Sequence, residues 1–415
     1  MNLPWIEHRL LERLLMQTGR VPIQFVLRNG ERVQTGDEEP VARVFIRDRR
    51  TLWKLACNPE LYFGDGYSDG SIRVEGDLVA LLDAVCKAGA DKLDKGILAR
   101  AVSRWLAQRQ RNSLCGSRKN IQHHYDIRTD FYRLWLDAQL VYTCAYFPSP
   151  DDSLSLEEAQ VAKMNQVCRK LQLKPGETVV EAGCGWGALA LYMAERCGVS
   201  VKAFNISREQ ILYARERARE RGLEGRVEFI EDDYRNIPGR CDAFVSVGML
   251  EHVGLDHYRD LGKVMHRVLG ADGRGFLHFI GRDRERPLNV WIRRRVFPGA
   301  YPPTLRQALG ILEPWGFAVL DIENLRLHYA RTLELWLDRF ESSAEKVTAM
   351  FSPQFTRAWR LYLAGSMIAF RTGFMQLFQV AFARSASNRI AWTRAHVYAG
   401  EPRVEGSDTW IPATY

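Results

Sequence analysis

The sequence lacks the features that mark several common protein classes. Its eight cysteines form no CxxC pair, and no group of Cys and His has the spacing of a zinc site. Dispersed thiols favour a reducing cytosol over a disulfide framework. The first residues do not form a signal peptide, because Glu7 and Glu12 interrupt an apolar, amphipathic helical pattern. We therefore expect a cytoplasmic protein that holds no metal ion.

Long uncharged runs are also scarce. The longest, residues 361–383, could span a bilayer by its length. It contains Arg371, Gln376 and Gln379, which make a membrane span unfavourable. We therefore expect a buried helix over residues 353–383 rather than a transmembrane segment.

Charge is abundant and unevenly distributed. The 415 residues carry a formal net charge of +8. Residues 91–119 contain eight basic and two acidic side chains, and residues 282–306 contain seven and two. Such stretches attract phosphate, either on nucleic acid or on anionic lipid, although a basic helix face can also be merely solvated.

The first 90 residues differ in pattern from the rest of the chain. Residues 21–33 predict a hairpin with Asn-Gly at the turn. Residues 59–77 are dense in Gly and Asp, which favours turns, and a helix is expected near residues 78–88. This region predicts a small α+β accessory domain.

Strands and helices alternate from about residue 120, which predicts a parallel, doubly wound sheet. Ser207 is a candidate cap for the helix after the second strand. Two helices, over 330–348 and 353–383, are expected before the last strand. The expected strands are 178–183, 199–204, 227–231, 243–247, 275–280, 318–322 and 392–398.

A glycine-rich turn follows the first of these strands. It contains Glu181, Gly183, Gly185 and Gly187, and glycines there let the backbone approach a ligand beside a helix N-terminus. A dinucleotide site would need an acidic residue at the end of the second strand, where Asn205 stands instead. The ExGxGxG pattern resembles motif I of class I S-adenosylmethionine-dependent methyltransferases, in which these residues serve the methionine and ribose end of the cofactor.

Further segments resemble the cyclopropane-fatty-acyl-phospholipid synthase family, which includes the mycolic acid cyclopropane synthases. The resemblance covers about residues 120–400, and the segment 63–67 is similar to the accessory domain of longer bacterial members. It implies a class I (Rossmann-like) α/β methyltransferase fold, a seven-stranded sheet with a small N-terminal α+β accessory domain. The matching segments are 124–126, 130–132, 142–147, 249–254, 276–280, 296–299, 327–330, Thr332, Leu333 and Trp336.

The resemblance implies an unusual methyl transfer. The family moves a methyl group from S-adenosylmethionine to a cis double bond of an acyl chain. An alkene is uncharged and needs no activating base, so the transfer depends mainly on positioning. The resulting carbocation loses a proton from the new methyl group to close the ring, and a bound bicarbonate is thought to take it. The implied bicarbonate ligands are Cys144, Glu251, His278, Tyr329 and the backbone of Ile280.

Each of these residues also has an ordinary structural interpretation. Cys144 alone would be a small buried apolar residue, His278 a core histidine and Tyr329 a core aromatic. Their joint occurrence at family positions favours function. Glu251 beside an anion would be repelled unless one of the two carries a proton.

The resemblance also assigns a cofactor site. In this sequence Glu181 stands where Asp is common, Thr143 where Ser is usual and Asn205 where several members have Thr. None of these changes removes a needed group. The implied cofactor residues are Tyr142, Thr143, Glu181, Gly183, Gly185, Gly187, Asn205, Ile206, Gln210, Asp233 and Tyr234.

We therefore expect an enzyme that makes cyclopropane rings in unsaturated phospholipids of an anionic bilayer, associated peripherally with the inner face of the membrane. Alternatives are the same methylation followed by a hydride shift to a methylene- or methyl-branched chain, a lipid-binding protein, and a nucleic-acid methyltransferase. The last is disfavoured because the [DNS]PP[YFW] and Pro-Cys motifs are absent. A homodimer is left open. The expected parts are an accessory domain (1–90), a basic helical linker (91–119), a catalytic domain (120–400) and a tail (401–415).

Overall fold

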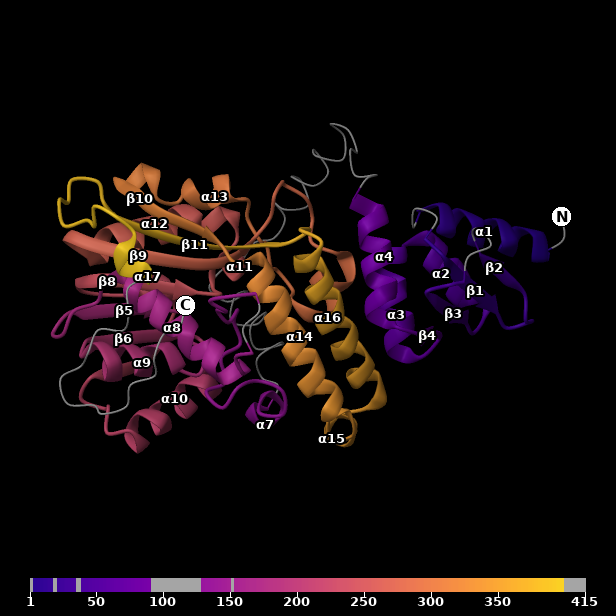
Figure 1. Cartoon of the computed structure of the whole chain (residues 1–415), viewed down its shortest axis with the longest axis horizontal. Helices are drawn as coiled ribbons and strands as arrows, with labels where there is room; N and C mark the ends of the chain where they lie inside the picture. Colours follow the sequence, from indigo (N-terminus) through magenta and orange to yellow (C-terminus); the bar gives the residue numbers. More distant parts are fainter. Residues whose placement is uncertain (1–2, 18–20, 35–38, 91–127, 151–152, 399–415) are drawn as a thin grey trace.

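The computed structural model describes residues 3–17, 21–34, 39–90, 128–150 and 153–398. The expected linker and tail, and the matching segment 124–126, lie outside the described residues. The described strands form a four-stranded sheet near the N-terminus and a seven-stranded sheet in the larger part of the molecule. Figure 1 shows the small sheet and its helices at one end of an elongated molecule.

The small sheet has the strand order β2-β1-β3-β4. The predicted hairpin is confirmed, because β1 and β2 pair antiparallel and Gly30 has a φ of 82° at the turn. The predicted amphipathic helix at the N-terminus is also confirmed, and its Leu11, Leu14 and Leu15 are buried against the sheet. The elements here are α1 (Leu3–Gln17), β1 (Ile23–Leu27), β2 (Arg32–Gln34), β3 (Ala42–Ile46), α2 (Arg49–Cys57), α3 (Pro59–Asp69), β4 (Ile72–Gly76) and α4 (Leu78–Ala90).

The expectation of turns over residues 59–77 is wrong, because α3 and β4 occupy most of this segment. The side chain of Asn58 accepts a hydrogen bond from the Leu61 N–H, and Pro59 stands in the first turn. Both features stabilise the N-terminus of the helix. Gly64 allows close packing inside the helix, since a Cβ there would lie 2.4 Å from the ring of Trp291. Gly64 therefore serves packing, whereas Gly70 ends the helix with a φ of 78°.

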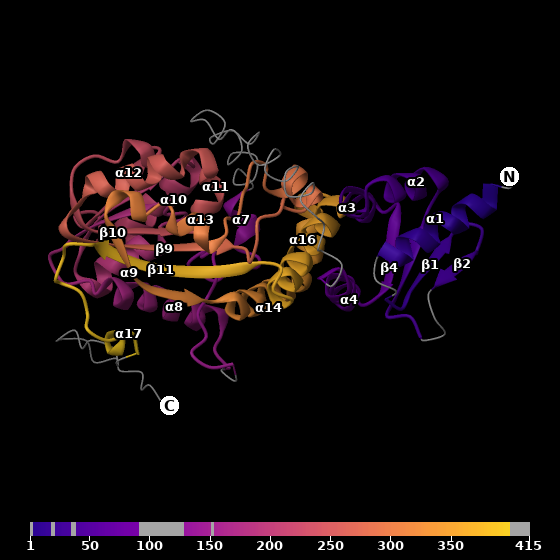
Figure 2. The ribbon, with the colours of Figure 1, turned by 90° about the horizontal axis from the view of Figure 1, so that it is seen from above.

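The N-terminal part packs against the larger part through α3 and α4, which contact α16 (Pro353–Arg371). Figures 1 and 2 both show α16 beside these two helices. The side chain of Arg295 donates two hydrogen bonds across the same junction to Asp65, at 2.9 and 2.8 Å. This packing brings α3 and α4 to the edge of a large cavity.

The seven-stranded sheet has the order β10-β11-β9-β8-β5-β6-β7. Neighbouring strands from β9 to β7 pair in parallel, whereas β11 is antiparallel to both β9 and β10. This is the arrangement expected of a class I methyltransferase. The strands are β5 (Thr178–Ala182), β6 (Ser200–Asn205), β7 (Val227–Glu231), β8 (Cys241–Val247), β9 (Leu269–Gly281), β10 (Phe317–Asn324) and β11 (Gln376–Arg384).

Helices cover both faces of this sheet. Apolar residues of α8, α9 and α10 form one buried cluster with the strands, and those of α12 and α13 form another. Ser207 caps α10 as predicted. These helices are α8 (Leu156–Leu171), α9 (Ala188–Cys197), α10 (Arg208–Glu220), α12 (Tyr258–Val268) and α13 (Leu305–Leu309). Shorter elements are α7 (Thr129–Tyr132), η1 (Tyr234–Asn236), α11 (Leu250–Val253), η2 (Leu255–His257), η3 (Ile292–Val296) and η4 (Glu313–Trp315).

The C-terminal elements differ from the prediction. The expected helix over 353–383 ends at Arg371, Gly373 follows with a φ of 83°, and the remainder forms β11. The expected strand over 392–398 is not formed, because Trp392 is fully exposed and residues 395–398 are helical, and β11 is instead the last strand of the sheet. The other elements are α14 (Arg326–Ser342), α15 (Ala344–Met350) and α17 (Ala395–Tyr398). Within the described ranges, every helix is too short or too polar to cross a membrane.

Candidate active site

The glycine-rich turn joins β5 to α9, as predicted. Gly183 and Gly187 both have a φ of 85°, a conformation that favours glycine. A Cβ at Gly187 would lie 2.6 Å from the ring of Phe229, so this glycine is needed for packing. A Cβ at Gly185 would meet nothing within 4 Å, which leaves space for a ligand.

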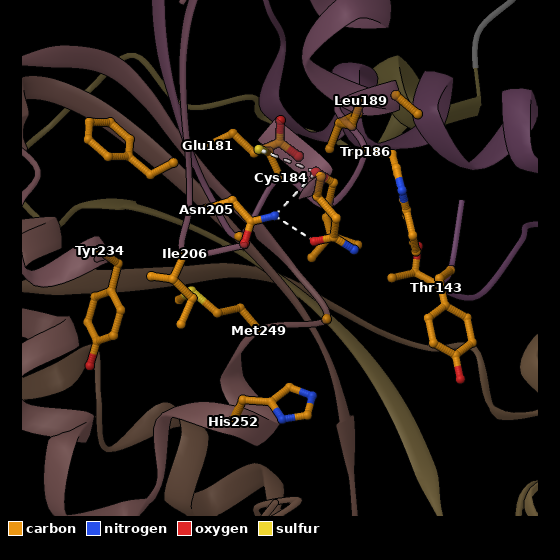
Figure 3. Close-up of a pocket in the computed structure, with 18 of the residues that line it drawn as sticks. Thr143, Glu181, Cys184, Trp186, Leu189, Asn205, Ile206, Tyr234, Met249 and His252 are labelled. Carbon is orange, nitrogen blue, oxygen red and sulfur yellow. Dashed lines mark hydrogen bonds between the residues drawn. The ribbon is translucent and has the colours of Figure 1, made fainter. Parts of the chain in front are cut away.

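This turn borders a cavity of about 160 Å³, which we call the first cavity. Figure 3 shows the side chains around it, including Glu181, Asn205 and His252. Gly187 does not line it, but all the other predicted cofactor residues do. These are Tyr142, Thr143, Glu181, Gly183, Gly185, Asn205, Ile206, Gln210, Asp233 and Tyr234.

Polar side chains hold the rim of the first cavity in place. The amide of Asn205 donates hydrogen bonds to the carbonyl of Gly185 at 3.2 Å and to Gln210 Oε1 at 2.7 Å, as the dashed lines in Figure 3 show. The carboxylate of Asp233 accepts from the guanidinium of Arg235 at 2.7 and 2.9 Å. The turn and the second strand are thus tied together at the ligand-facing edge.

Glu181 and Lys163 are two buried ionisable side chains that both line this cavity. Burial raises the pKa of Glu181 to about 8, and burial lowers the pKa of Lys163 to about 8. Among the described residues, Glu181 Oε2 has no hydrogen-bond partner. A positively charged ligand would stabilise the ionised carboxylate here. Sequence reasoning missed Lys163, because its position inside α8 has no local pattern that marks a site.

A second cavity of about 490 Å³ lies beside the first. The two cavities share Tyr142, Thr143, Gly248 and His252 in their linings. The lining of the second cavity includes many apolar side chains from α4, α14 and α16, such as that of Leu361. It also includes the five predicted bicarbonate ligands, namely Cys144, Glu251, His278, Ile280 and Tyr329.

Two ionisable groups of this set are buried with unused hydrogen-bonding capacity. Glu251 Oε1 accepts from the Ile280 N–H, and Gln379 Nε2 lies 3.1 Å from His278 Nδ1. Within the part of the chain that the structure describes, Glu251 Oε2 and His278 Nε2 have no partner. Burial raises the pKa of Glu251 to about 7 and holds the pKa of His278 well below its ordinary value.

The other three predicted ligands are engaged in different ways. The Cys144 thiol donates to the carbonyl of Ala145 at 3.1 Å, and burial raises the pKa of the thiol, so it stays protonated. The ring of Tyr329 packs on Phe370 at a centroid distance of 4.5 Å. The backbone N–H of Ile280 was expected to donate to a bound anion. In the structure it donates to Glu251 Oε1.

Several other residues line the second cavity, and sequence reasoning did not single them out. Arg282 is buried at the end of β9, and burial lowers the pKa of its guanidinium to about 10. Gly365 of α16 lines the cavity with open space at its Cβ position. The aromatic side chains of Phe370 and Phe374 also line the cavity. The ring of Phe378 packs against that of Phe279, at a centroid distance of 5.8 Å.

The chain is similar to known proteins over most of its length. A family model described as mycolic acid cyclopropane synthetase matches residues 112–380, and a domain of unknown function matches residues 10–95. A "Probable fatty acid methyltransferase" of Pseudomonas putida is 32% identical over 397 residues, covering 92% of this chain and 98% of the relative. The cyclopropane-fatty-acyl-phospholipid synthase of Escherichia coli (strain K12) is 39% identical over 275 residues, covering 66% of this chain and 70% of the relative.

A solved structure extends the similarity to three dimensions. The mycolic acid cyclopropane synthase CmaA1, complexed with SAH and CTAB, superposes with a TM-score of 0.61 at 30% identity. The match covers 64% of this chain and 98% of CmaA1. The fold, the glycine turn and this neighbour support S-adenosylmethionine as co-substrate. This chain therefore belongs to the mycolic acid cyclopropane synthetase family, as an S-adenosylmethionine-dependent methyltransferase of the cyclopropane synthase type.

Proposed function

We propose that this protein transfers a methyl group from S-adenosylmethionine to the cis double bond of an unsaturated phospholipid acyl chain and closes a cyclopropane ring. The observation that carries the proposal is the pair of cavities that meet at Tyr142, Thr143, Gly248 and His252. A cofactor bound in the first cavity would face an acyl chain held in the second. Direct contact across this boundary is what a transfer governed by positioning requires.

Side chains on the two sides of the boundary suit the two reactants. On the cofactor side, the ionised form of Glu181 would attract the positive charge of the sulfonium compound. On the lipid side, burial among apolar residues would exclude water from the developing carbocation. Tyr329 and Phe370 line the same cavity, and an aromatic ring face would stabilise a positive charge that lies over it.

The polar cluster fits a small anion such as bicarbonate, which would accept the proton lost from the new methyl group. Glu251 Oε2 and His278 Nε2 are buried and, within the described ranges, unpartnered, so both can bind a group placed between them. With a pKa raised by burial to about 7, Glu251 carries a proton in a large fraction of molecules near neutral pH. Protonated Glu251 donates a hydrogen bond and avoids the repulsion of two adjacent anions.

The same proposal includes peripheral binding to an anionic bilayer at the inner face of the membrane. The segment 282–306 carries a net positive charge, and Arg294 in it is exposed. Basic side chains near such a surface contribute about 1 kcal/mol each. An enzyme that takes an acyl chain from a bilayer has to sit on that surface. Lipid is therefore favoured over nucleic acid as the partner of the basic stretch.

Mass spectrometry of lipids from cells that express the protein tests the proposed function. With labelled methionine, we expect phospholipids that gain one labelled methylene unit and resist catalytic hydrogenation. A labelled product that takes up hydrogen would indicate a methylene branch, the alternative outcome of the same cation. Unlabelled phospholipids would contradict the proposal.

A further inference from the structure

The side chain of His278 is held by a chain of hydrogen bonds that runs away from the second cavity. His278 on β9 and Gln379 on β11 are directly opposite each other in the antiparallel pairing of these strands. Gln379 Nε2 lies 3.1 Å from His278 Nδ1, and Gln379 Oε1 accepts from Lys170 Nζ at 2.8 Å. Lys170 in turn donates to Glu323 Oε2 at 2.5 Å.

Elementary hydrogen-bond chemistry fixes the direction of every step. The ammonium of Lys170 has donors only, so the atom of Gln379 that faces it must be the carbonyl oxygen. The other end of the same amide is then the NH₂ group, which donates to His278 Nδ1. A ring nitrogen that accepts a hydrogen bond carries no proton, so in the neutral imidazole the proton resides on Nε2.

Burial makes this arrangement costly to change. The side chains of His278 and Gln379 are almost completely buried, and the Lys170 side chain is 1% exposed. Turning the Gln379 amide over would set its NH₂ group against the Lys170 ammonium, with two donors facing each other in a dry environment. Leaving buried polar groups without partners is costly, and more so when one of them is charged.

We propose that Lys170 and Gln379 are positioning residues that hold His278 as the neutral Nε2–H tautomer, so that His278 donates a hydrogen bond into the reacting cavity. His278 then binds an anion or a substrate oxygen and does not remove a proton. Proton removal falls to Glu251 or to a group bound beside it. This inference rests on the proposed function for its chemical meaning, but the tautomer is a property of the protein without substrate.

Nuclear magnetic resonance of protein labelled with ¹⁵N-histidine measures this directly. The chain has nine histidines, and the signals of His278 are those lost in His278→Gln. In the substrate-free wild type we expect a protonated Nε2 and an unprotonated Nδ1. A proton on Nδ1 would overturn the proposal. If the tautomer is as expected but no cyclopropane forms, the proposed function fails and the tautomer assignment stands.

Gln379→Glu tests the consequence for catalysis. A carboxylate between Lys170 and His278 accepts from both, so we expect the proton to move to Nδ1. The wrong tautomer should lower kcat about 10–100-fold, the range found when the hydrogen-bond partner of a metal-bound histidine is removed, while S-adenosylmethionine binding is unchanged. A proton on Nδ1 with wild-type kcat would contradict the proposal.

Gln376→Glu is the matched control. It makes the same change three residues earlier on β11, outside the linings of both cavities, where the side chain contacts the carbonyl of Gly373. We expect wild-type kcat and an unchanged His278 tautomer. If Gln379→Glu does not fold, Gln379→Met removes both hydrogen bonds without adding charge. It should then yield a mixture of tautomers and a lower kcat, and a pure Nε2–H state with full activity would contradict the proposal.

Discussion

At the scale of single residues, Glu251 links folding stability to chemistry. Burial raises its pKa to about 7 in the folded protein, against about 4.3 when unfolded. The native state therefore binds more protons between these two values, so wild-type stability falls as pH rises through this window. Gln at this position keeps an oxygen to accept from the Ile280 N–H and has no charge to bury.

We predict that Glu251→Gln stabilises the protein relative to wild type by about 1–3 kcal/mol above pH 7 and by little near pH 4. Methyl transfer to lipid should fall by at least about 10²-fold, because a proton acceptor or its partner is lost. Thermal unfolding at several pH values, together with activity and S-adenosylmethionine binding, measures all three quantities. A stability difference that does not depend on pH would refute this account of Glu251.

Gly248 stands where the two cavities meet and has a φ of 71°. A Cβ there would lie 2.9 Å from Thr143 Cγ2. Gly248→Ala should destabilise the fold by about 1–2 kcal/mol through its backbone conformation. It should also reduce methyl transfer by displacing Thr143.

Gly222→Ala is the matched control for this change. Gly222 has a similar φ of 65°, but a Cβ there meets nothing within 4 Å. We expect comparable destabilisation with full activity, measured by denaturant unfolding and the lipid assay. Equal activity of the two variants would show that the boundary at Gly248 does not matter.

Most site residues that were predicted from the sequence line the two cavities. Other buried polar residues at the site were not predicted. Gly187 belongs to the motif, yet its lack of a side chain serves packing against Phe229. Lys163, Gln379 and Arg282 reach the site from elements far apart in the chain, and no local pattern marks such positions. The residue-level roles of the predicted ligands stay predictions.

At the scale of elements, α16 forms a wall of the second cavity. Gly365 lines the cavity from within this helix and has open space at its Cβ position. Gly365→Ala should stabilise the helix by about 1 kcal/mol. Gly365→Leu and Gly365→Phe should fill the cavity in steps.

We predict that activity on long acyl chains falls from Ala to Leu to Phe at this position, while stability and S-adenosylmethionine binding are retained. Assays with phospholipids of different chain length measure the effect. Full activity of the Phe variant on long chains would mean that the acyl chain does not lie beside α16.

The two misassigned segments show what limits prediction at this scale. Residues 361–383 are mostly apolar, and a run of this kind fits a buried helix and a buried strand equally well. Gly373, with its positive φ, separates α16 from β11, but a single glycine does not identify such a break. Residues 59–77 were expected to turn because of their glycines, whereas Gly64 makes room for Trp291 across the junction with the larger part of the molecule.

At the scale of the whole molecule, the arginines at 293–295 are expected to serve two roles, docking of the N-terminal part and binding to a lipid surface. Arg295 is paired with Asp65 across the junction, so it contributes to docking of the N-terminal part. Arg293 is half-buried and Arg294 is exposed. The lipid surface is therefore expected to engage Arg293 and Arg294 more than Arg295.

We predict that co-sedimentation with anionic vesicles weakens as salt rises, and weakens again in Arg293→Gln/Arg294→Gln. A Debye length of about 8–10 Å at ordinary ionic strength limits this attraction to groups near the surface. Arg295→Gln should mainly lower stability. Binding that is the same on neutral and anionic vesicles at every salt concentration would exclude the electrostatic account.

The proposed function depends on ring closure by loss of a proton from the transferred methyl group. The most direct measurement uses the purified protein, vesicles of an unsaturated phospholipid and S-adenosylmethionine with a fully deuterated methyl group, followed by mass spectrometry of the lipid. We expect a product that resists hydrogenation and has lost one deuteron of the transferred methyl group. A product that retains every deuteron in a methyl branch, or a lipid that acquires no label, would contradict it.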